Sequence, residues 1–125
     1  MKNVAILTFY YKSANYGGIL QAYALQKAIE MLGCNAKQIS YDLSSGMNIQ
    51  KKNLLEKATA KFNRYVKYGQ WATEFYKRQR MLFSFAETIP HTDPVDVSTI
   101  GTLINKFELF VCGSDQIWNP MGWQS

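Results

Sequence analysis

The first 41 residues alternate between strand, helix and strand patterns, and this alternation limits the fold more than any other feature. Residues 4–9 form a compact apolar run, which is typical of a buried parallel strand. Residues 36–41 alternate enough to form a second strand, with Ile39 and Tyr41 on one side. Between them, apolar residues recur at helical steps of 3 and 4: Gly18, Ala22, Leu25, Ile29 and Leu32. The sequence therefore predicts a βαβ unit with a right-handed crossover.

Capping residues and breakers define the other boundaries. Asn15 or Ser13 is placed to cap the first helix, and Gly33 is placed to end it in the left-handed conformation. Residues 50–68 and 70–86 have helical patterns separated by Gly69. We expect Ser98 to cap a short helix over residues 99–105, with Ile100, Leu103 and Ile104 facing inward, and residues 108–112 to form a third strand. The predicted class is α/β, a Rossmann-like parallel sheet with a helical insertion at about residues 50–87.

Size and composition describe an ordinary globular domain. The chain has 125 residues, 47% hydrophobic and 18% charged, which is enough for one domain with its own core. No apolar run approaches the ~20 residues of a membrane helix, and the first residues lack the features of a signal peptide, so we expect a cytoplasmic protein. Cys34 and Cys112 fit no metal spacing; we expect reduced thiols, with Cys112 buried in a strand, and no metal site.

Positive charge is concentrated in the predicted helical insertion. Residues 51–80 contain nine Lys and Arg against two Glu, a net +7, so the rest of the chain sums to −2. Such a field attracts nucleic acid, an anionic membrane or an acidic glycan. We interpret the run as a solvated helical face and expect no nucleic-acid partner, because Phe75, Leu82, Phe83 and Ala86 have the spacing of core residues. Peripheral membrane contact through the basic helices remains open.

A dense polar cluster follows the third predicted strand, at Gly113-Ser114-Asp115-Gln116-Ile117-Trp118-Asn119. A parallel strand that ends in Gly-Ser-Asp places polar side chains at the edge of the sheet where α/β folds bind ligands. Asp115 can hold or deprotonate a sugar hydroxyl, and the amides of Gln116 and Asn119 offer donors and acceptors. Trp118 can stack on a sugar face or fill the space under the loop. Alternatively, Ser114 and Asp115 simply cap a helix.

The turn Asn15-Tyr16-Gly17-Gly18 is a second candidate site. A helix start with two glycines exposes backbone N–H groups that can bind an anion. The spacing is not G-x-G-x-x-G and has no Walker lysine, so the alternative, that the glycines allow close packing of helix on strand, weighs equally. The single histidine, His91, has no partner at metal or triad spacing, and we expect it in an exposed loop.

Two segments resemble the polysaccharide pyruvyl transferase family. Residues 6–9, residues 15–26, Gly33 and Tyr41-Asp42 look like the family's opening, and residues 110–120 resemble its most distinctive motif. The resemblance implies a two-lobed architecture similar to the B-type glycosyltransferases, of which this chain covers only the N-terminal lobe. It also implies transfer of a pyruvyl group from phosphoenolpyruvate, the donor substrate, to a glycan or lipid-linked sugar, with no cofactor.

The resemblance assigns roles to the two candidate sites. Asp115 would orient or deprotonate the acceptor hydroxyl, and the remaining site residues would line the same cleft: Asn15, Tyr16, Gly17, Gly18, Ser114, Gln116, Trp118 and Asn119. The family's Arg and His set for phosphoenolpyruvate lies in its C-terminal half, and no residue here matches it. We therefore expect no turnover by residues 1–125 alone. A non-catalytic carbohydrate-binding module and a nucleotide-sugar glycosyltransferase-like enzyme are the alternatives.

Overall fold

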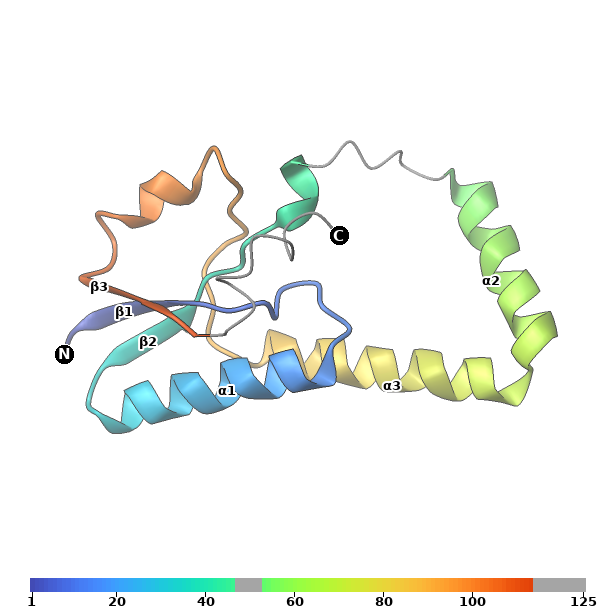
Figure 1. Cartoon of the computed structure of the whole chain (residues 1–125), viewed down its shortest axis with the longest axis horizontal. Coiled ribbons are helices and arrows are strands. Elements are labelled where there is room, and N and C mark those ends of the chain that lie inside the picture. Colours follow the sequence, from blue (N-terminus) through green and yellow to red (C-terminus); the bar gives the residue numbers. More distant parts are fainter. Residues whose placement is uncertain (47–52, 114–125) are drawn as a thin grey trace.

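The chain folds around a three-stranded parallel sheet, so it belongs to the α/β class (Figure 1). This computed structural model describes residues 1–46 and 53–113. The sheet has the order β2-β1-β3, formed by β1 (Asn3–Leu7), β2 (Asn35–Gln38) and β3 (Leu109–Cys112). All three expected strands are present, each somewhat shorter than its sequence pattern.

Helix α1 (Tyr16–Met31) covers one face of the sheet. Its first turn is capped by Asn15, as expected, and Gly33 follows its end with φ of +80°. The predicted inward face is wrong at one position: Leu32 is 81% exposed. The buried residues of the helix are Ile19, Ala22 and Gln26. The difference arises because Leu32 lies past the last turn, where the chain already bends toward β2.

The opposite face of the sheet is covered by the chain that leads into β3. Residues 91–95 run parallel to the end of β2, through the pairs Gln38–His91 and Tyr41–Val95. The 3₁₀ turn η2 (Ile100–Leu103) then packs on this face, with Leu103 buried. A second 3₁₀ turn, η1 (Leu43–Gly46), follows β2. The core on this side consists of Ala5, Ile39, Val95 and Leu103.

The expected short helix near residue 99 is wrong in its extent and in its cap. Only the four residues of η2 are helical, and Ile104 is 68% exposed instead of facing inward. Asp96, not Ser98, anchors the turn, because its Oδ1 accepts hydrogen bonds from the backbone N–H groups of Ser98 and Thr99. The aspartate's longer side chain bridges the residues that follow it in an Asx turn.

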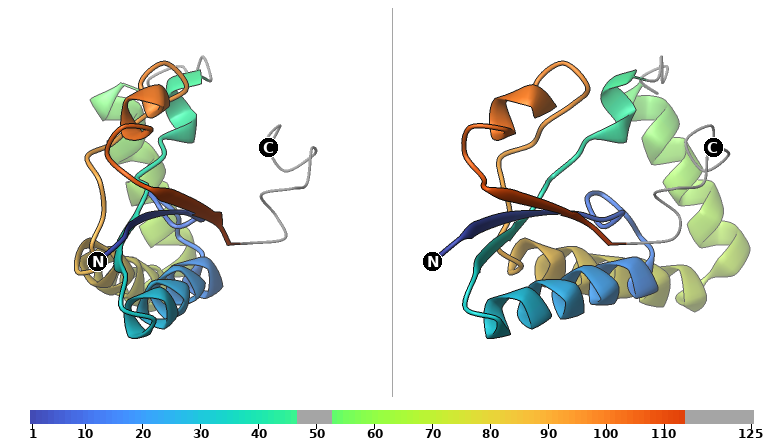
Figure 2. Two further views of the ribbon diagram at one scale, coloured as in Figure 1. Left: turned by 90° about the vertical axis from the view of Figure 1, so that its left-hand side faces the viewer. Right: turned by 60° about the vertical axis from the view of Figure 1, so that its left-hand side comes forward.

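Helices α2 (Leu54–Tyr68) and α3 (Gln70–Glu87) meet at a sharp corner and project from the sheet (Figures 1 and 2). Gly69 separates them with φ of +52°, which confirms it as the break. Only the last part of α3 packs on α1: Leu82, Phe85 and Ala86 pack against the cluster that contains Ile19 and Ala22. The rest of α3 extends past α1.

Two residues with the spacing of core residues are exposed: Phe75 by 36% and Phe83 by 41%. Phe75 lies in the part of α3 that extends past α1, where α1 does not cover the apolar face of the helix. Phe83 lies next to Leu82 in the part that packs on α1, but it is not among the side chains that pack against the cluster of Ile19 and Ala22. Cys112 is also exposed rather than buried, because β3 is an edge strand in the described part of the chain.

Among the described residues, no helix combines the length and apolar composition required to cross a membrane.

Polar side chains are buried between β2 and its neighbours. Thr8 Oγ1 donates to Gln38 Oε1 at 2.9 Å, and Gln38 Nε2 donates to the Ala22 carbonyl at 2.8 Å. Ser40 Oγ donates to the Thr92 carbonyl at 2.9 Å. Buried polar groups must be paired to avoid a desolvation penalty, so these bonds fix α1 and residues 91–95 against β2.

Candidate functional site

The carboxyl ends of β1 and β3 define a topological switch point. The chain passes from β1 to β2 on one side and later returns to place β3 on the other side of β1. In open parallel sheets, ligands bind outside the carboxyl ends of the strands at such a point. Leu7 pairs with Cys112 there, and the Gly113 N–H donates to the Leu7 carbonyl at 3.0 Å. The end of β3 is thus fixed beside the end of β1.

Gly113, the first residue of the polar cluster, is held in a tight space. A Cβ atom at this position would lie 2.0 Å from Leu25 Cδ2 and 3.6 Å from Thr8 Cγ2. The backbone therefore passes directly over the junction of β1 and α1. Gly113 lies at the carboxyl edge of the sheet, as the sequence pattern predicts for the start of the cluster. The other site residues of this cluster, Ser114, Asp115, Gln116, Trp118 and Asn119, lie outside the described residues.

A pocket of about 320 Å³ opens at the same edge, between the loops that follow β1 and β2. Its lining residues come from residues 7–13 and 41–44, and the polar ones include Thr8, Lys12, Ser13, Asp42 and Ser44. Lys12 has φ of +53°, a left-handed conformation that is uncommon for a residue other than glycine. Such backbone strain concentrates at functional sites, where the surrounding structure maintains it.

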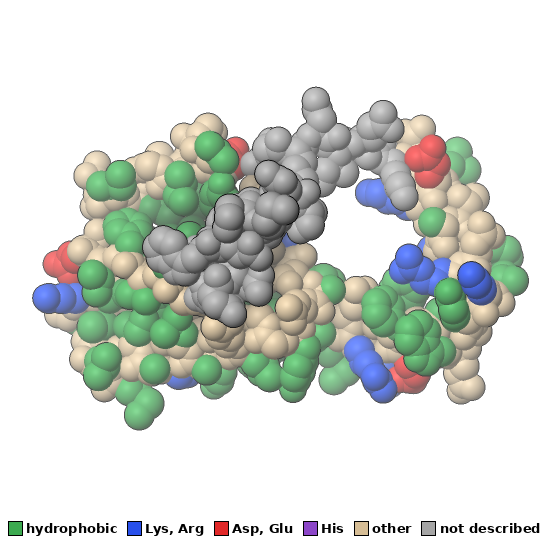
Figure 3. Space-filling model, viewed as in Figure 1, with side chains coloured by type: hydrophobic (Ala, Val, Ile, Leu, Met, Phe, Trp, Pro, Cys, Tyr) green, Lys and Arg blue, Asp and Glu red, His purple; other side chains and the backbone are tan. Residues whose placement is uncertain are grey.

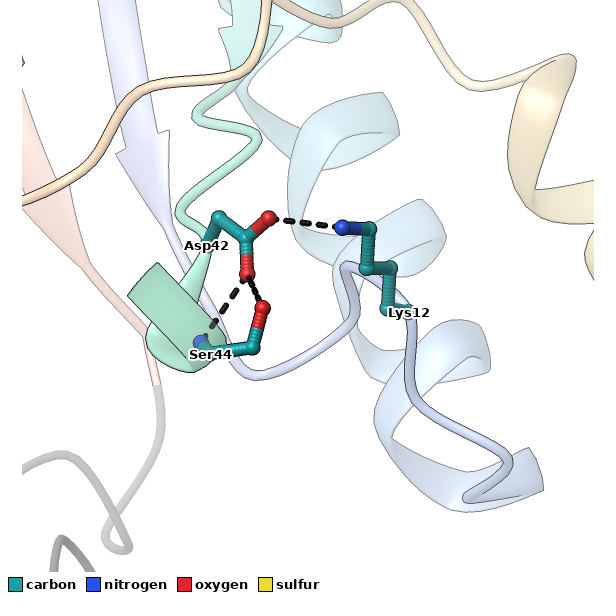
Figure 4. Close-up of polar contacts among 3 residues, drawn as sticks. All are labelled: Lys12, Asp42 and Ser44. Carbon is teal, nitrogen blue, oxygen red and sulfur yellow. Dashed lines mark hydrogen bonds and ion pairs between the residues drawn. The ribbon is translucent and has the colours of Figure 1, made fainter. Parts of the chain in front are cut away.

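Three side chains in this pocket form a connected polar group (Figure 4). Lys12 Nζ donates to Asp42 Oδ2 at 2.6 Å. Asp42 Oδ1 accepts from the Ser44 backbone N–H at 2.9 Å and from Ser44 Oγ at 2.5 Å. The hydrogen bond from Lys12, followed by those from Ser44, lowers the pKa of Asp42 to about 2. The same contact raises the pKa of Lys12 above its ordinary value.

These pKa shifts limit the chemistry that the pair can perform. A carboxylate with a pKa near 2 is ionised at neutral pH and is a weak base. Asp42 is therefore suited to accept a hydrogen bond from a ligand hydroxyl, not to remove its proton. Lys12 keeps its charge, and its ammonium group has further N–H bonds to offer an anion or a hydroxyl. The Lys12–Asp42–Ser44 group can thus form hydrogen bonds with a polar ligand.

The turn at Asn15-Tyr16-Gly17-Gly18 lies next to this pocket, because Ser13 lines the pocket and its Oγ accepts from the Asn15 N–H at 3.0 Å. Asn15 Oδ1 accepts from Gly17 N at 3.0 Å and from Gly18 N at 3.4 Å. An anion at this turn must therefore displace the Asn15 side chain from two amides. A Cβ at Gly18 would lie 2.9 Å from the Phe9 carbonyl oxygen, so this glycine does allow close packing of helix on loop.

The remaining candidates contribute little to this site. His91 is exposed, as expected, and its Nδ1 lies 2.6 Å from the Ile89 carbonyl oxygen. Within residues 1–46 and 53–113, no group of three or more His, Cys, Asp or Glu could hold a metal ion.

Sequence reasoning missed the Lys12–Asp42–Ser44 group. Asp42 entered only as part of the motif Tyr41-Asp42, and Lys12 and Ser44 had no assigned role. The available signal was positional: Lys12 follows the first strand and Asp42-Leu43-Ser44 follows the second, so parallel pairing brings both loops to one edge. The 30-residue separation of Lys12 and Asp42 carries no local pattern that would reveal the contact.

Comparison of the chain with protein-family models, with curated protein sequences and with solved structures found no match. The resemblance to the polysaccharide pyruvyl transferases accordingly rests on the two sequence segments described above. The geometry at the carboxyl edge of the sheet is an independent observation.

Proposed function

We propose that this chain is the N-terminal, Rossmann-like lobe of a two-lobed transferase that moves a pyruvyl group from phosphoenolpyruvate to a sugar of a cell-surface or exopolysaccharide precursor. The observation that carries the proposal is the position of Gly113. Gly113 opens the polar cluster within the family-like motif and lies at the switch point of the sheet. It contacts Leu7 and Thr8, which also line the Lys12–Asp42 pocket. Two segments far apart in the sequence thus meet at the edge where such folds bind ligands.

The proposed reaction joins one donor to two hydroxyl groups of one sugar. A general acid protonates the methylene carbon of phosphoenolpyruvate, which produces an oxocarbenium-like centre. One hydroxyl attacks this centre, inorganic phosphate leaves, and the second hydroxyl closes the ring to a ketal. Asp115 is the proposed residue that orients or deprotonates the attacking hydroxyl. The second lobe supplies the groups that bind phosphoenolpyruvate.

The described pocket fits the acceptor side of this reaction. Its hydroxyl, carboxylate and ammonium groups match the alternating donors and acceptors of a sugar. Asp42 would hold an acceptor hydroxyl without removing its proton, because its pKa is about 2. This division leaves proton transfer to Asp115 and positioning to Lys12, Asp42 and Ser44.

Replacement of Asp115 by Asn is the direct test, because it preserves shape and removes the base. With the full-length protein, phosphoenolpyruvate and a panel of sugar acceptors, we expect Asp115→Asn to reduce phosphate release and ketal formation by roughly 10²- to 10⁴-fold. Acceptor affinity, measured by calorimetry, should change little. Asp93→Asn is the matched control, because Asp93 is an exposed aspartate outside the pocket. Normal turnover by Asp115→Asn would show that the assignment is wrong.

A carbohydrate-binding module without catalysis is the second candidate. It is favoured by the ion-paired state of Lys12 and Asp42, which suits them to hydrogen bonding rather than proton transfer. Sugar binding with no phosphate release by the wild-type protein would support this candidate and contradict the transferase proposal. Residues 1–125 alone should bind without turnover under either proposal.

A further inference from the structure

Helix α2 and the first part of α3, residues 54–80, extend away from the sheet, and we call this segment the arm (Figures 1 and 2). No residue of α2 is buried, and Ala72 is the single buried residue of α3. Large apolar side chains are exposed along the arm: Leu54 is 90% exposed, Val66 68% and Phe62 66%. Exposed apolar side chains of this size and number are typical of an interaction surface.

The arm carries the whole net charge of the chain. Residues 54–80 contain seven Lys and Arg and two Glu, which gives +5, and the remaining residues contain seven cations and seven carboxylates, which gives zero. In the described part of the chain the ion pairs are Lys12–Asp42 and Lys27–Glu30, neither of them in the arm. The positive charge is therefore available to an anionic partner (Figure 3).

Helix α2 separates its apolar and basic residues onto different sides. At 3.6 residues per turn, six of its apolar residues fall within an arc of about 120°, and Ala60 and Tyr68 lie outside it. The six are Leu54, Leu55, Ala58, Phe62, Tyr65 and Val66. Lys57, Arg64 and Lys67 lie on the other side of the helix. An apolar side opposite a basic side is the pattern of a helix that lies in a membrane interface.

A groove of about 1040 Å³ runs between α2 and α3 and combines the same two properties. Phe62, Tyr65 and Met81 provide apolar surface, while Lys61, Lys77 and Arg80 line the groove with positive charge. Lys61 Nζ lies 5.5 Å from the centre of the Tyr76 ring. Anionic lipids are complementary to this groove. Their negative headgroups can pair with its cations, and their acyl chains can contact its apolar surface.

We propose that the arm docks on the surface of an anionic phospholipid bilayer. The apolar arc of α2 inserts at the level of the headgroups, and the arm's cations contact the lipid phosphates. Charge complementarity favours this partner over a second copy of the chain, because pairing two arms would bring together two surfaces of +5. The aliphatic exposure of Leu54, Leu55 and Val66 favours lipid over nucleic acid, which offers no comparable apolar surface. The proposal does not rest on the transferase function.

Co-sedimentation with vesicles tests the proposal. Vesicles of phosphatidylcholine alone are compared with vesicles that also contain phosphatidylglycerol, and we expect the full chain to bind only the anionic set, less tightly as salt increases. The triple variant Lys61→Gln, Lys77→Gln, Arg80→Gln should lose roughly 100-fold in affinity, at about 5-fold per charge. The matched control is Lys2→Gln, Lys37→Gln, Lys106→Gln, which removes three exposed cations outside the arm and should retain most of the affinity.

A second variant separates apolar insertion from charge attraction. Phe62→Ser and Leu55→Ser together should weaken vesicle binding at least 10-fold while its salt dependence persists. Both side chains are exposed, so the far-UV circular dichroism spectrum should match the wild type. Equal binding to both vesicle types, or equal losses in the arm and control triples, would overturn the proposal. So would arm variants that change the oligomeric state, or a preference for duplex DNA over anionic vesicles.

Discussion

The sheet and the arm use their apolar residues in opposite ways. Val4, Ala5 and Ile6 of β1 are fully buried, whereas α2 has no buried residue. The sheet side chains contact α1 on one face and η2 on the other, so burial from water stabilises them. The arm also carries many aromatic and aliphatic side chains, but these contact mainly one another, as Trp71 and Phe75 do, and most stay exposed. The difference teaches that apolar periodicity identifies a face but not what covers it.

The largest contrast concerns single apolar truncations. We expect Ile6→Ala to reduce the free energy of unfolding by ~2–5 kcal/mol, because Ile6 is completely buried and its loss leaves a cavity. Phe62→Ala in the arm should change it by no more than ~0.5 kcal/mol, because the ring is already in solvent. Urea denaturation followed by circular dichroism measures both. If Ile6→Ala and Phe62→Ala lowered the free energy of unfolding equally, the proposed difference between sheet and arm would be wrong.

Two adjacent glycines of α1 show how tightly the helix packs on the chain after β1. Gly18→Ala should destabilise the protein by ~1–3 kcal/mol, because its Cβ would lie 2.9 Å from the backbone oxygen of Phe9. Gly17→Ala is the control, since its nearest contact would be an ordinary 3.4 Å from Asn15 Oδ1. The midpoints of thermal unfolding should separate the two variants, with Gly17→Ala close to the wild type.

The same polar-to-apolar substitution can be compared in the two regions. Thr8→Val leaves Gln38 Oε1 buried without its donor and should cost ~1–3 kcal/mol of stability. Thr59 Oγ1 donates to the Leu55 carbonyl on the exposed surface of α2, where water can replace it. Thr59→Val should therefore change the unfolding free energy by at most ~0.5 kcal/mol. A chemical denaturation series on both variants checks this expectation, and a reversed order would contradict it.

The smallest expected effect is electrostatic and lies in the pocket. The pKa of Asp42 is lowered to about 2, below the ~3.9 of an unfolded aspartate. The group therefore contributes stability above about pH 4, and this contribution is lost as the pH falls toward 2. Lys12→Met should raise the Asp42 pKa, but the bonds from Ser44 should keep it below the ordinary value. A carboxyl-carbon NMR titration measures this pKa directly, and an unchanged pKa would refute the role of Lys12.

Local sequence patterns predicted the elements well where the deciding interactions are local. Asn15 caps α1 through the next three residues, and Gly33 and Gly69 mark helix ends through their own backbone conformations. Apolar runs predicted β1 and β3, and alternation of side chains predicted β2. The fold class and the approximate positions of the strands could therefore be predicted from the sequence alone.

The patterns failed where the outcome depends on distant residues. Phe75 has core spacing, but the length of α3 relative to α1 leaves it exposed. Gln26 and Gln38 are polar yet buried, because backbone carbonyls of Ala36 and Ala22 accept from them. The Lys12–Asp42 contact arises only when two loops meet at one edge of the sheet. The role assigned to Asp115 stays a prediction.

Hydrogen exchange, with and without vesicles, tests the contrast between sheet and arm most directly. We predict slow exchange of the β1 and β2 amides under all conditions, and faster exchange of the α2 amides in solution, since no residue of α2 is buried. Anionic vesicles should slow exchange in α2 selectively, and phosphatidylcholine vesicles should leave it unchanged. Exchange in α2 as slow as in the sheet without vesicles, or an α2 unaffected by anionic vesicles, would contradict the account.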